Sequence, residues 1–127
     1  IKEKAVFPSG SAELVPESQK IGPIIAGLLV PLSERVVISG HTDNVPIATA
    51  QYPSNWELSS ARAMNFMKFI IAQDGRLNPA RFSAIGYSEY HPVVSNDTEA
   101  GRVQNRRVEV LIARKYQFNN SEAPVSF

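Results

Sequence analysis

The β-branched run Val36, Val37 and Ile38 is the sequence feature that most restricts the fold. Its continuous apolar character, with no alternating polar residue, is the pattern of a central strand covered on both faces. Helical periodicity lies on either side of the run, with apolar residues at intervals of three and four over 21–29 and again over 55–72. A central strand between two such segments indicates an α/β fold.

Shorter segments complete the expected pattern. Residues 4–7, 81–87 and 107–112 have the composition or alternation of strands, and residues 98–104 those of a helical turn. The predicted order is therefore β-α-β-α-β-(α)-β, an α/β sandwich with helices packed on a mixed sheet. We expect one domain over residues 1–115 and an irregular C-terminal tail over residues 116–127.

Proline, glycine and capping residues predict where the two long helices begin and end. The first helix either starts late or bends at Pro23, which lacks a backbone donor, and it ends at Pro31. At the start of the second helix, Ser54 and Glu57 have the spacing of a capping box. At its end, Gly75 supplies a left-handed exit.

The composition excludes several classes of function. The chain of 127 residues contains no cysteine, which excludes a disulfide scaffold, a thiolate zinc site and a cysteine nucleophile. Its formal net charge of +1 provides no basic field for nucleic acid. His41 and His91 are the only histidines and no cluster of further ligands joins them, so neither a metal nor another cofactor is expected. We interpret His41 as a strand-end histidine hydrogen-bonded to the backbone.

Enzymatic signatures are weak as well. There is no Gly-x-Ser-x-Gly turn, and no second carboxylate is singled out beside Asp43 for glycoside hydrolysis. We therefore expect a binding module rather than an enzyme.

The polar connection from His41 to Pro53 is the best candidate for a functional segment. It has thirteen residues, more than most connections need. Asp43 lies in it just beyond the central strand, where ligands of open α/β sheets bind. Arg62 is the natural opposite charge, on a helix edge shared with Asn55 and close to Leu58. The residues alone leave two alternatives open, a ligand site or a structural ion pair between Asp43 and Arg62.

Two adjacent arginines, Arg106 and Arg107, lead into the last strand. Neighbouring strand residues point to opposite faces, so these two side chains cannot have the same role.

Four blocks of sequence, in order, make the chain recognisable as a whole. They are Gly40-His41-Thr42-Asp43, Asn55-x-x-Leu58-Ser59-x-x-Arg62-Ala63, Gly86-Tyr87-x-Glu89 with Pro92, and Gly101-Arg102-x-x-Asn105-Arg106-Arg107-Val108-Glu109. From about Phe7 to Ala113 the chain resembles the OmpA-like peptidoglycan-binding domain.

Two further details resemble one branch of that superfamily, the flagellar motor stator B subunits MotB and PomB. They are Asn44-Val45-Pro46-Ile47 directly after the aspartate and Tyr52-Pro53-Ser54-Asn55-Trp56-Glu57-Leu58-Ser59. OmpA and Pal proteins usually have a shorter connection there that contains glycine.

The resemblance implies a fold, a ligand and a set of site residues. The ligand is peptidoglycan, bound non-covalently through diaminopimelate of the stem peptide. Asp43 and Arg62 match the principal contacts and Thr42 and Asn55 match flanking positions. Leu58 and an arginine of the Asn105-Arg106-Arg107 run, taken here as Arg106, line the site. A carboxylate can receive the ammonium of diaminopimelate and a guanidinium can hold its carboxylate by two parallel hydrogen bonds.

The resemblance also implies a cellular setting. A stator B subunit would place this domain in the periplasm, as a homodimer, below a single N-terminal transmembrane helix that precedes the present chain and pairs with the stator A subunit. The alternatives are an OmpA- or Pal-type protein that tethers the outer membrane to peptidoglycan and, as a rival class, a peptidoglycan-cleaving enzyme.

Overall fold

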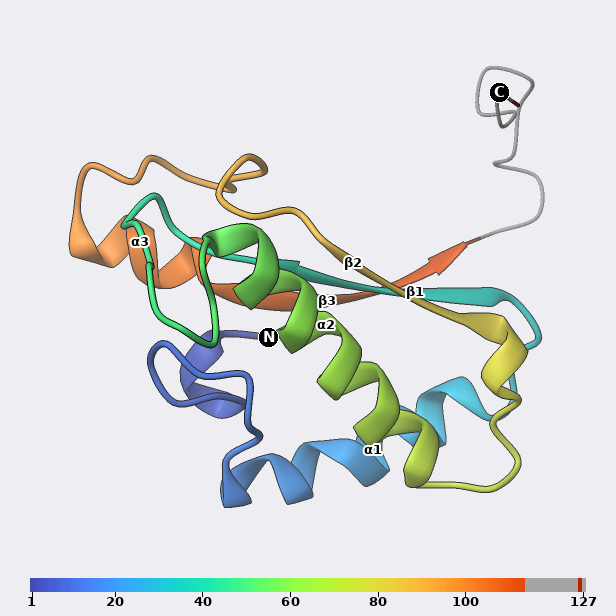
Figure 1. Cartoon of the computed structure of the whole chain (residues 1–127). Helices are drawn as coiled ribbons and strands as arrows, with labels where there is room; N and C mark the ends of the chain where they lie inside the picture. The colour runs from blue at the N-terminus through green and yellow to red at the C-terminus, as the bar shows by residue number, and fades with distance from the viewer. Residues whose placement is uncertain (114–125, 127) are drawn as a thin grey trace.

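A mixed sheet forms the centre of the molecule (Figure 1). The computed structural model describes residues 1–113 and residue 126, and within them the sheet has the order β2-β1-β3. The strands are β1 (Arg35–His41), β2 (Phe82–Gly86) and β3 (Arg107–Ala113). Strand β1 pairs parallel with β2 and antiparallel with β3, which confirms both the central position of β1 and the mixed character of the sheet.

The helices α1 (Ile21–Leu29) and α2 (Asn55–Ala72) lie on one face of this sheet (Figure 1). The short helix α3 (Glu99–Asn105) precedes β3. Three 3₁₀ segments complete the described elements: η1 (Glu3–Ala5), η2 (Pro16–Lys20) and η3 (Pro79–Arg81). Among the described residues, no helix has the length and apolar character that a membrane crossing requires.

The core lies between the sheet and the two long helices. Val36 and Ile38 of β1 are fully buried there against Phe66 and Ile70 of α2. Burying side chains of this size contributes about 1.5–3 kcal/mol each, so these four residues account for much of the docking of α2 onto β1. The predicted fold class, helices packed on a mixed sheet, is confirmed.

The opposite face of the sheet differs from the prediction. We expected β1 to be covered on both faces, but Val37 is only half buried, and Ile85 and Leu111 on the neighbouring strands are exposed. Val37 pairs with Leu111 in the register of β1 and β3. Because the central strand β1 has a neighbouring strand on each side, those strands cover part of Val37. An apolar residue is therefore tolerated there, although this face of the sheet is otherwise open.

Two glycines allow α2 to lie close to the sheet. A Cβ atom at Gly40 would lie 2.2 Å from the carbonyl oxygen of Ser59, and one at Gly86 would lie 2.4 Å from the backbone nitrogen of Ser60. Any side chain at either position would push α2 outward. The close approach places the first turns of α2 beside the end of β1.

The predicted strand over residues 4–7 is wrong. Lys2 forms a single antiparallel bridge with Arg107, and the chain then turns through η1. Val6 and Phe7 follow, and both are buried in the core. Consecutive strand residues point to opposite faces, so a turn is what lets these two neighbours enter the same core.

The helix starts follow the predictions. Of the two alternatives at Pro23, the late start is the correct one: α1 begins at Ile21, so Pro23 lies in the first turn, where a backbone donor is not needed. Helix α2 has the predicted bounds, and the Ser54 side chain accepts a hydrogen bond from the backbone of Trp56.

The prediction for the end of α2 is wrong. Gly75 is not left-handed, since Gly10 is the one glycine with positive φ in the described residues. The Asp74 carboxylate accepts a hydrogen bond from the backbone of Arg76 instead, which turns the chain without a left-handed residue. The predicted tail over residues 116–127 lies outside the described residues, apart from residue 126.

Candidate binding site

A cavity of about 470 Å³ opens beyond the carboxyl end of β1. All six residues proposed from the sequence line it: Thr42, Asp43, Asn55, Leu58, Arg62 and Arg106. They come from the loop after β1, from the first turns of α2 and from the residue before β3. The structure therefore brings together side chains that are up to 64 positions apart in the chain.

The loop after β1 is held in shape by its own polar groups. The backbone of Val45 donates a hydrogen bond of 3.0 Å to Asp43 Oδ1, and the Asn55 amide donates one of 3.1 Å to the Val45 carbonyl. Thr42 donates through its hydroxyl to the Asp43 carbonyl and through its backbone to the Ser88 carbonyl. Thr42 and Asn55 thus fix the position of Asp43 at the cavity wall.

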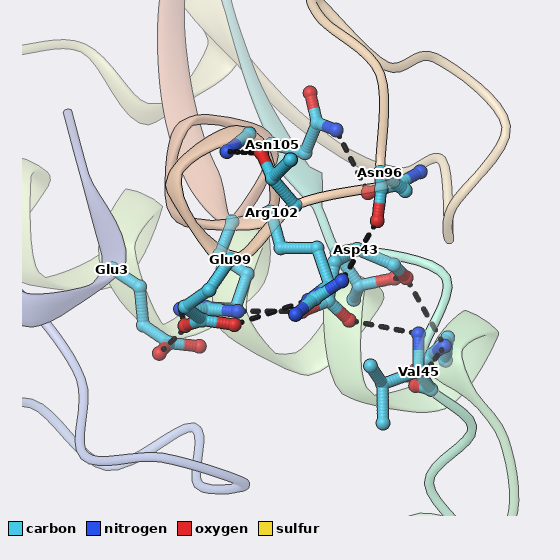
Figure 2. Close-up of polar contacts among 12 residues, drawn as sticks. Glu3, Asp43, Val45, Asn96, Glu99, Arg102 and Asn105 are labelled. Carbon is cyan, nitrogen blue, oxygen red and sulfur yellow. Dashed lines mark hydrogen bonds and ion pairs between the residues drawn. The ribbon is translucent and has the colours of Figure 1, made fainter.

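Arg106 lies among three carboxylates, those of Glu3, Asp43 and Glu99, which Figure 2 labels. Its Nη1 donates to Asp43 Oδ2 at 2.6 Å, its Nη2 donates to Glu99 Oε1 at 2.8 Å, and its Nε lies 3.4 Å from Glu3 Oε1. Burial lowers the pKa of Arg106, but the hydrogen bonds to Glu99 and Asp43 and the charge of Glu3 outweigh this effect and raise it. Arg106 is therefore a fixed cation at the cavity wall.

Arg62 is held by the N-terminal segment. Its Nη1 donates to Glu3 Oε2 at 2.6 Å, its Nε to the Ser11 carbonyl at 2.7 Å and its Nη2 to the Pro8 carbonyl at 3.1 Å. The guanidinium also lies over the Phe7 ring, 5.1 Å from its centroid. Only 3% of the side chain is exposed, so Arg62 is a buried cation in the cavity lining.

Asp43 and Arg62 do not form the ion pair that the sequence allowed as an alternative. Asp43 pairs with Arg106, Arg62 pairs with Glu3, and Glu3 contacts both arginines. The four side chains form one network, with Glu3 between the two cations.

Sequence reasoning missed two members of this site, Glu3 and Glu99. Glu99 could have been found, because it begins the helical turn that ends next to Arg106 and its charge is opposite. Nothing in the sequence pointed to Glu3, because it lies 59 positions from Arg62 and directly before the predicted strand over residues 4–7.

The structure also separates the two adjacent arginines. Arg106 lines the cavity, whereas Arg107 pairs with Glu109 at 2.6 Å and donates to the His91 carbonyl on the other side of β3. Arg106 is thus the one of the two that faces the candidate site.

The interpretation of His41 needs correction. Its Nε2 lies 3.1 Å from the Ser39 hydroxyl rather than against the backbone, and its ring stacks on Tyr87 with a centroid distance of 5.1 Å. Burial, aided by the charge of Arg107, lowers the pKa of His41 to about 4, so the ring is neutral at pH 7. Within residues 1–113 and 126, no three His, Asp or Glu side chains are grouped so as to hold a metal ion.

The arrangement suits a small ligand that carries both charges. Asp43 and Arg106 line the cavity with a carboxylate and a guanidinium, Leu58 provides an apolar wall, and Arg62 lines it as a second guanidinium that Glu3 occupies. A ligand with an ammonium and a carboxylate on one carbon matches this distribution of charge.

Comparisons with known proteins agree over most of the chain. The OmpA family model matches residues 6–106. Motility protein B of Bacillus subtilis is 49% identical over 113 residues, which are 88% of this chain and 43% of that protein. The peptidoglycan-associated lipoprotein of Pseudomonas aeruginosa is 32% identical over 104 residues, 82% of this chain and 58% of that protein. The chain thus spans about half the length of these curated relatives.

Solved structures agree with the sequence comparisons. The cell wall anchor of the T6SS from Pseudomonas aeruginosa superposes with a TM-score of 0.81 at 41% identity, covering 90% of this chain and 79% of that one. The periplasmic domain of Helicobacter pylori MotB gives a TM-score of 0.81 over 91% of this chain and 80% of that one, and at 24% identity it supports the fold alone. The family match and the relatives together show that the chain belongs to the OmpA family.

Proposed function

We propose that this chain binds peptidoglycan non-covalently, through the diaminopimelate residue of the stem peptide. The observation that carries the proposal is the cavity beyond β1, where Asp43 and two guanidinium groups converge in a domain of the OmpA family. Two of the relatives are named for contact with the wall, the peptidoglycan-associated lipoprotein and the T6SS cell wall anchor.

The proposed contacts follow from the chemistry of the ligand. The ammonium of diaminopimelate binds the Asp43 carboxylate, which the Val45 backbone and Arg106 already orient. The carboxylate on the same carbon binds Arg62 by two parallel hydrogen bonds, with Arg106 beside it. Thr42 and Asn55 position Asp43, and the methylene chain of the ligand packs against Leu58.

We further propose that this binding anchors a flagellar motor stator to the cell wall. The 49% identity to a motility protein B, over most of this chain, supports it. The residues 44–47 and 52–59, which resemble the stator B subunits, form the loop and the first turns of α2 at the cavity. In this proposal the domain is periplasmic and dimeric, a transmembrane helix upstream joins it to the stator A subunit, and it has no enzymatic activity.

Co-sedimentation with purified sacculi tests peptidoglycan binding. The chain should pellet with the sacculi, free diaminopimelate should release it, and the supernatant should contain no muropeptides. Retention that a large excess of diaminopimelate does not reduce would contradict the assigned site. Release of soluble muropeptides would identify a peptidoglycan-cleaving enzyme instead.

A domain exchange tests the stator role separately. The present chain would replace the matching part of motility protein B in Bacillus subtilis, and swimming would be scored on soft agar. Motility with the exchanged domain, and its loss on Asp43→Asn, is the expected result. A chimera that is expressed and binds sacculi but does not swim would leave wall binding intact and contradict the stator role.

A further inference from the structure

We propose that the N-terminal turn, residues 2–5, is a built-in competitor for the ligand carboxylate. Its Glu3 carboxylate occupies the guanidinium groups that the ligand needs, and the ligand binds by displacing Glu3 together with the turn. This inference rests on the proposed function of the cavity and adds a means by which the same site is opened and closed.

Glu3 contacts the cavity arginines in the way that a bound carboxylate would. Its Oε2 accepts a hydrogen bond of 2.6 Å from Arg62 Nη1, and its Oε1 lies 3.4 Å from Arg106 Nε. Each oxygen of one carboxylate thus faces a different cation. Glu3 and Arg62 line the same cavity as Asp43, so the chain's own acid stands where an external one would bind.

Arg62 is inaccessible while the N-terminal segment is in place. All three of its nitrogens donate to acceptors of that segment, Glu3, Pro8 and Ser11, and 3% of its side chain is exposed. A second carboxylate cannot form two parallel hydrogen bonds with Arg62 until Glu3 has left. Displacement is therefore a condition for the contact proposed above.

Backbone contacts with β3, rather than fully buried side chains, attach the turn to the domain. None of the residues of η1 is buried, and the segment joins β3 through backbone contacts: two hydrogen bonds between Ile1 and Val108, the bridge from Lys2 to Arg107, and the hydrogen bond from the Glu3 backbone to the Arg106 carbonyl. Directly after it, Val6 and Phe7 are buried in the core. Segments with few buried contacts open at low free-energy cost, so the turn can move while Val6 and Phe7 stay in place.

The charge balance of the site also supports displacement of Glu3 by a ligand carboxylate. With Glu3 in place, the two cavity arginines face the three carboxylates of Glu3, Asp43 and Glu99. When Glu3 leaves, the buried Arg62 loses its ion-pair partner. An incoming carboxylate restores that ion pair. A ligand that lacks a carboxylate gains nothing from the opening, so the turn also selects for an acidic ligand.

Glu3→Gln tests the competition directly, because it removes the charge and keeps the size of the side chain. Binding of free diaminopimelate would be measured by isothermal titration calorimetry at pH 7. A ligand that no longer competes with an internal carboxylate should bind roughly fivefold or more tightly, the usual size of coupling between two binding events. Glu17→Gln is the matched control, since Glu17 is exposed on η2 away from the cavity, and it should bind like the wild type.

A disulfide between Lys2→Cys and Arg107→Cys tests the displacement and leaves Glu3 and Arg62 intact. These residues are a non-hydrogen-bonded antiparallel pair. Such pairs typically have Cα atoms about 4.5 Å apart, a separation that a disulfide can bridge. The sequence has no other cysteine, so no other disulfide can form within the chain. The oxidised variant should bind diaminopimelate at least several-fold more weakly than the same variant after reduction.

The outcomes distinguish a failure of the Glu3 competitor from a failure of the proposed diaminopimelate binding. Thermal unfolding shows whether Glu3→Gln is folded. If it is folded and binds diaminopimelate no more tightly than the wild type, the proposal that Glu3 competes with the ligand is overturned. If Glu3→Gln does not fold, equal affinity of the oxidised and reduced disulfide variant overturns it. If neither the wild type nor any variant binds diaminopimelate, the proposed function of the cavity has failed, and the competitor with it.

Discussion

Glu3 Oε2 lies 2.6 Å from Arg62 Nη1, although 59 positions of the chain separate the two residues. The contact joins the N-terminal turn to the second turn of α2 in the lining of the candidate site. It gives Arg62 two roles at once. The guanidinium is a member of a buried ion pair, and it is also a proposed ligand contact.

Arg62→Ala should therefore lower stability as well as binding. Breaking a buried ion pair from one side typically costs about 3–5 kcal/mol, because the remaining charge loses its partner; here Glu3 keeps only its longer contact of 3.4 Å with Arg106. We expect a clear fall in the midpoint of denaturant unfolding. Arg76→Ala, which removes an exposed pair with Asp74, is the control and should leave the midpoint where it is. An unchanged midpoint for Arg62→Ala would mean that the N-terminal turn does not hold Arg62 in solution.

Asp43→Asn should reduce diaminopimelate binding and leave the fold intact. The amide oxygen can still accept the backbone hydrogen bond from Val45, and Arg106 keeps Glu3 and Glu99 as partners, so the loop keeps its shape. The charge that receives the ammonium is lost, and a hydrogen bond to a charged group contributes about 1.5–3 kcal/mol, which corresponds to a loss of roughly tenfold or more in affinity. Calorimetry and circular dichroism measure the two effects. Asp97→Asn, an exposed aspartate, is the control, and equal affinities for both variants would remove Asp43 from the site.

The parts of the fold that could be predicted are those that local chemistry determines. Helix α2 has the predicted bounds because its first residue follows the Ser54 cap and its apolar stripe, with Phe66 and Ile70, is regular. Strand β1 was placed by three β-branched residues in a row. In both cases neighbouring residues in the chain carry the whole signal.

The parts that could not be predicted depend on contacts between distant segments. Val6 and Phe7 resemble a strand by composition, but the core accepts both side chains only if the chain turns before them. The partners of Arg62 come from residues 3–11, which a helix pattern around Arg62 cannot indicate. The six candidate site residues line one cavity, but the sequence did not predict how their charges pair, because pairing depends on the acids that tertiary structure supplies.

Ser54→Ala should destabilise the domain. The Ser54 side chain accepts a hydrogen bond from the Trp56 backbone and also donates to the Glu57 carboxylate, so its loss leaves the first turn of α2 without a cap. Replacing such a cap by alanine costs about 0.5–2 kcal/mol, which thermal unfolding can detect. Ser33→Ala, at an exposed position before β1, is the control. Equal midpoints for the two variants would show that α2 does not depend on this cap.

The last prediction concerns His41 and pH. The folded protein holds the pKa of His41 at about 4, mainly through burial, against an ordinary value of 6.5. A lowered histidine pKa means that the unfolded chain binds the proton more readily. The stabilising contribution of neutral His41 is therefore complete above pH 6.5 and is lost as the pH falls from 6.5 towards 4. Each pH unit in this window costs about 1.4 kcal/mol, so the total loss is about 3 kcal/mol.

Denaturant unfolding at several pH values between 7.5 and 4 measures this contribution. Carboxylates titrate in the lower part of the same window, so the wild type must be compared with His41→Gln, whose side chain cannot take up a proton there. The variant should be less stable at pH 7.5, because it loses the stacking of His41 on Tyr87, and the gap to the wild type should narrow as the pH falls. Parallel curves for the two proteins over the whole range would mean that His41 titrates alike in the folded and unfolded chains, and that its burial against Tyr87 and Ser39 does not exclude the proton.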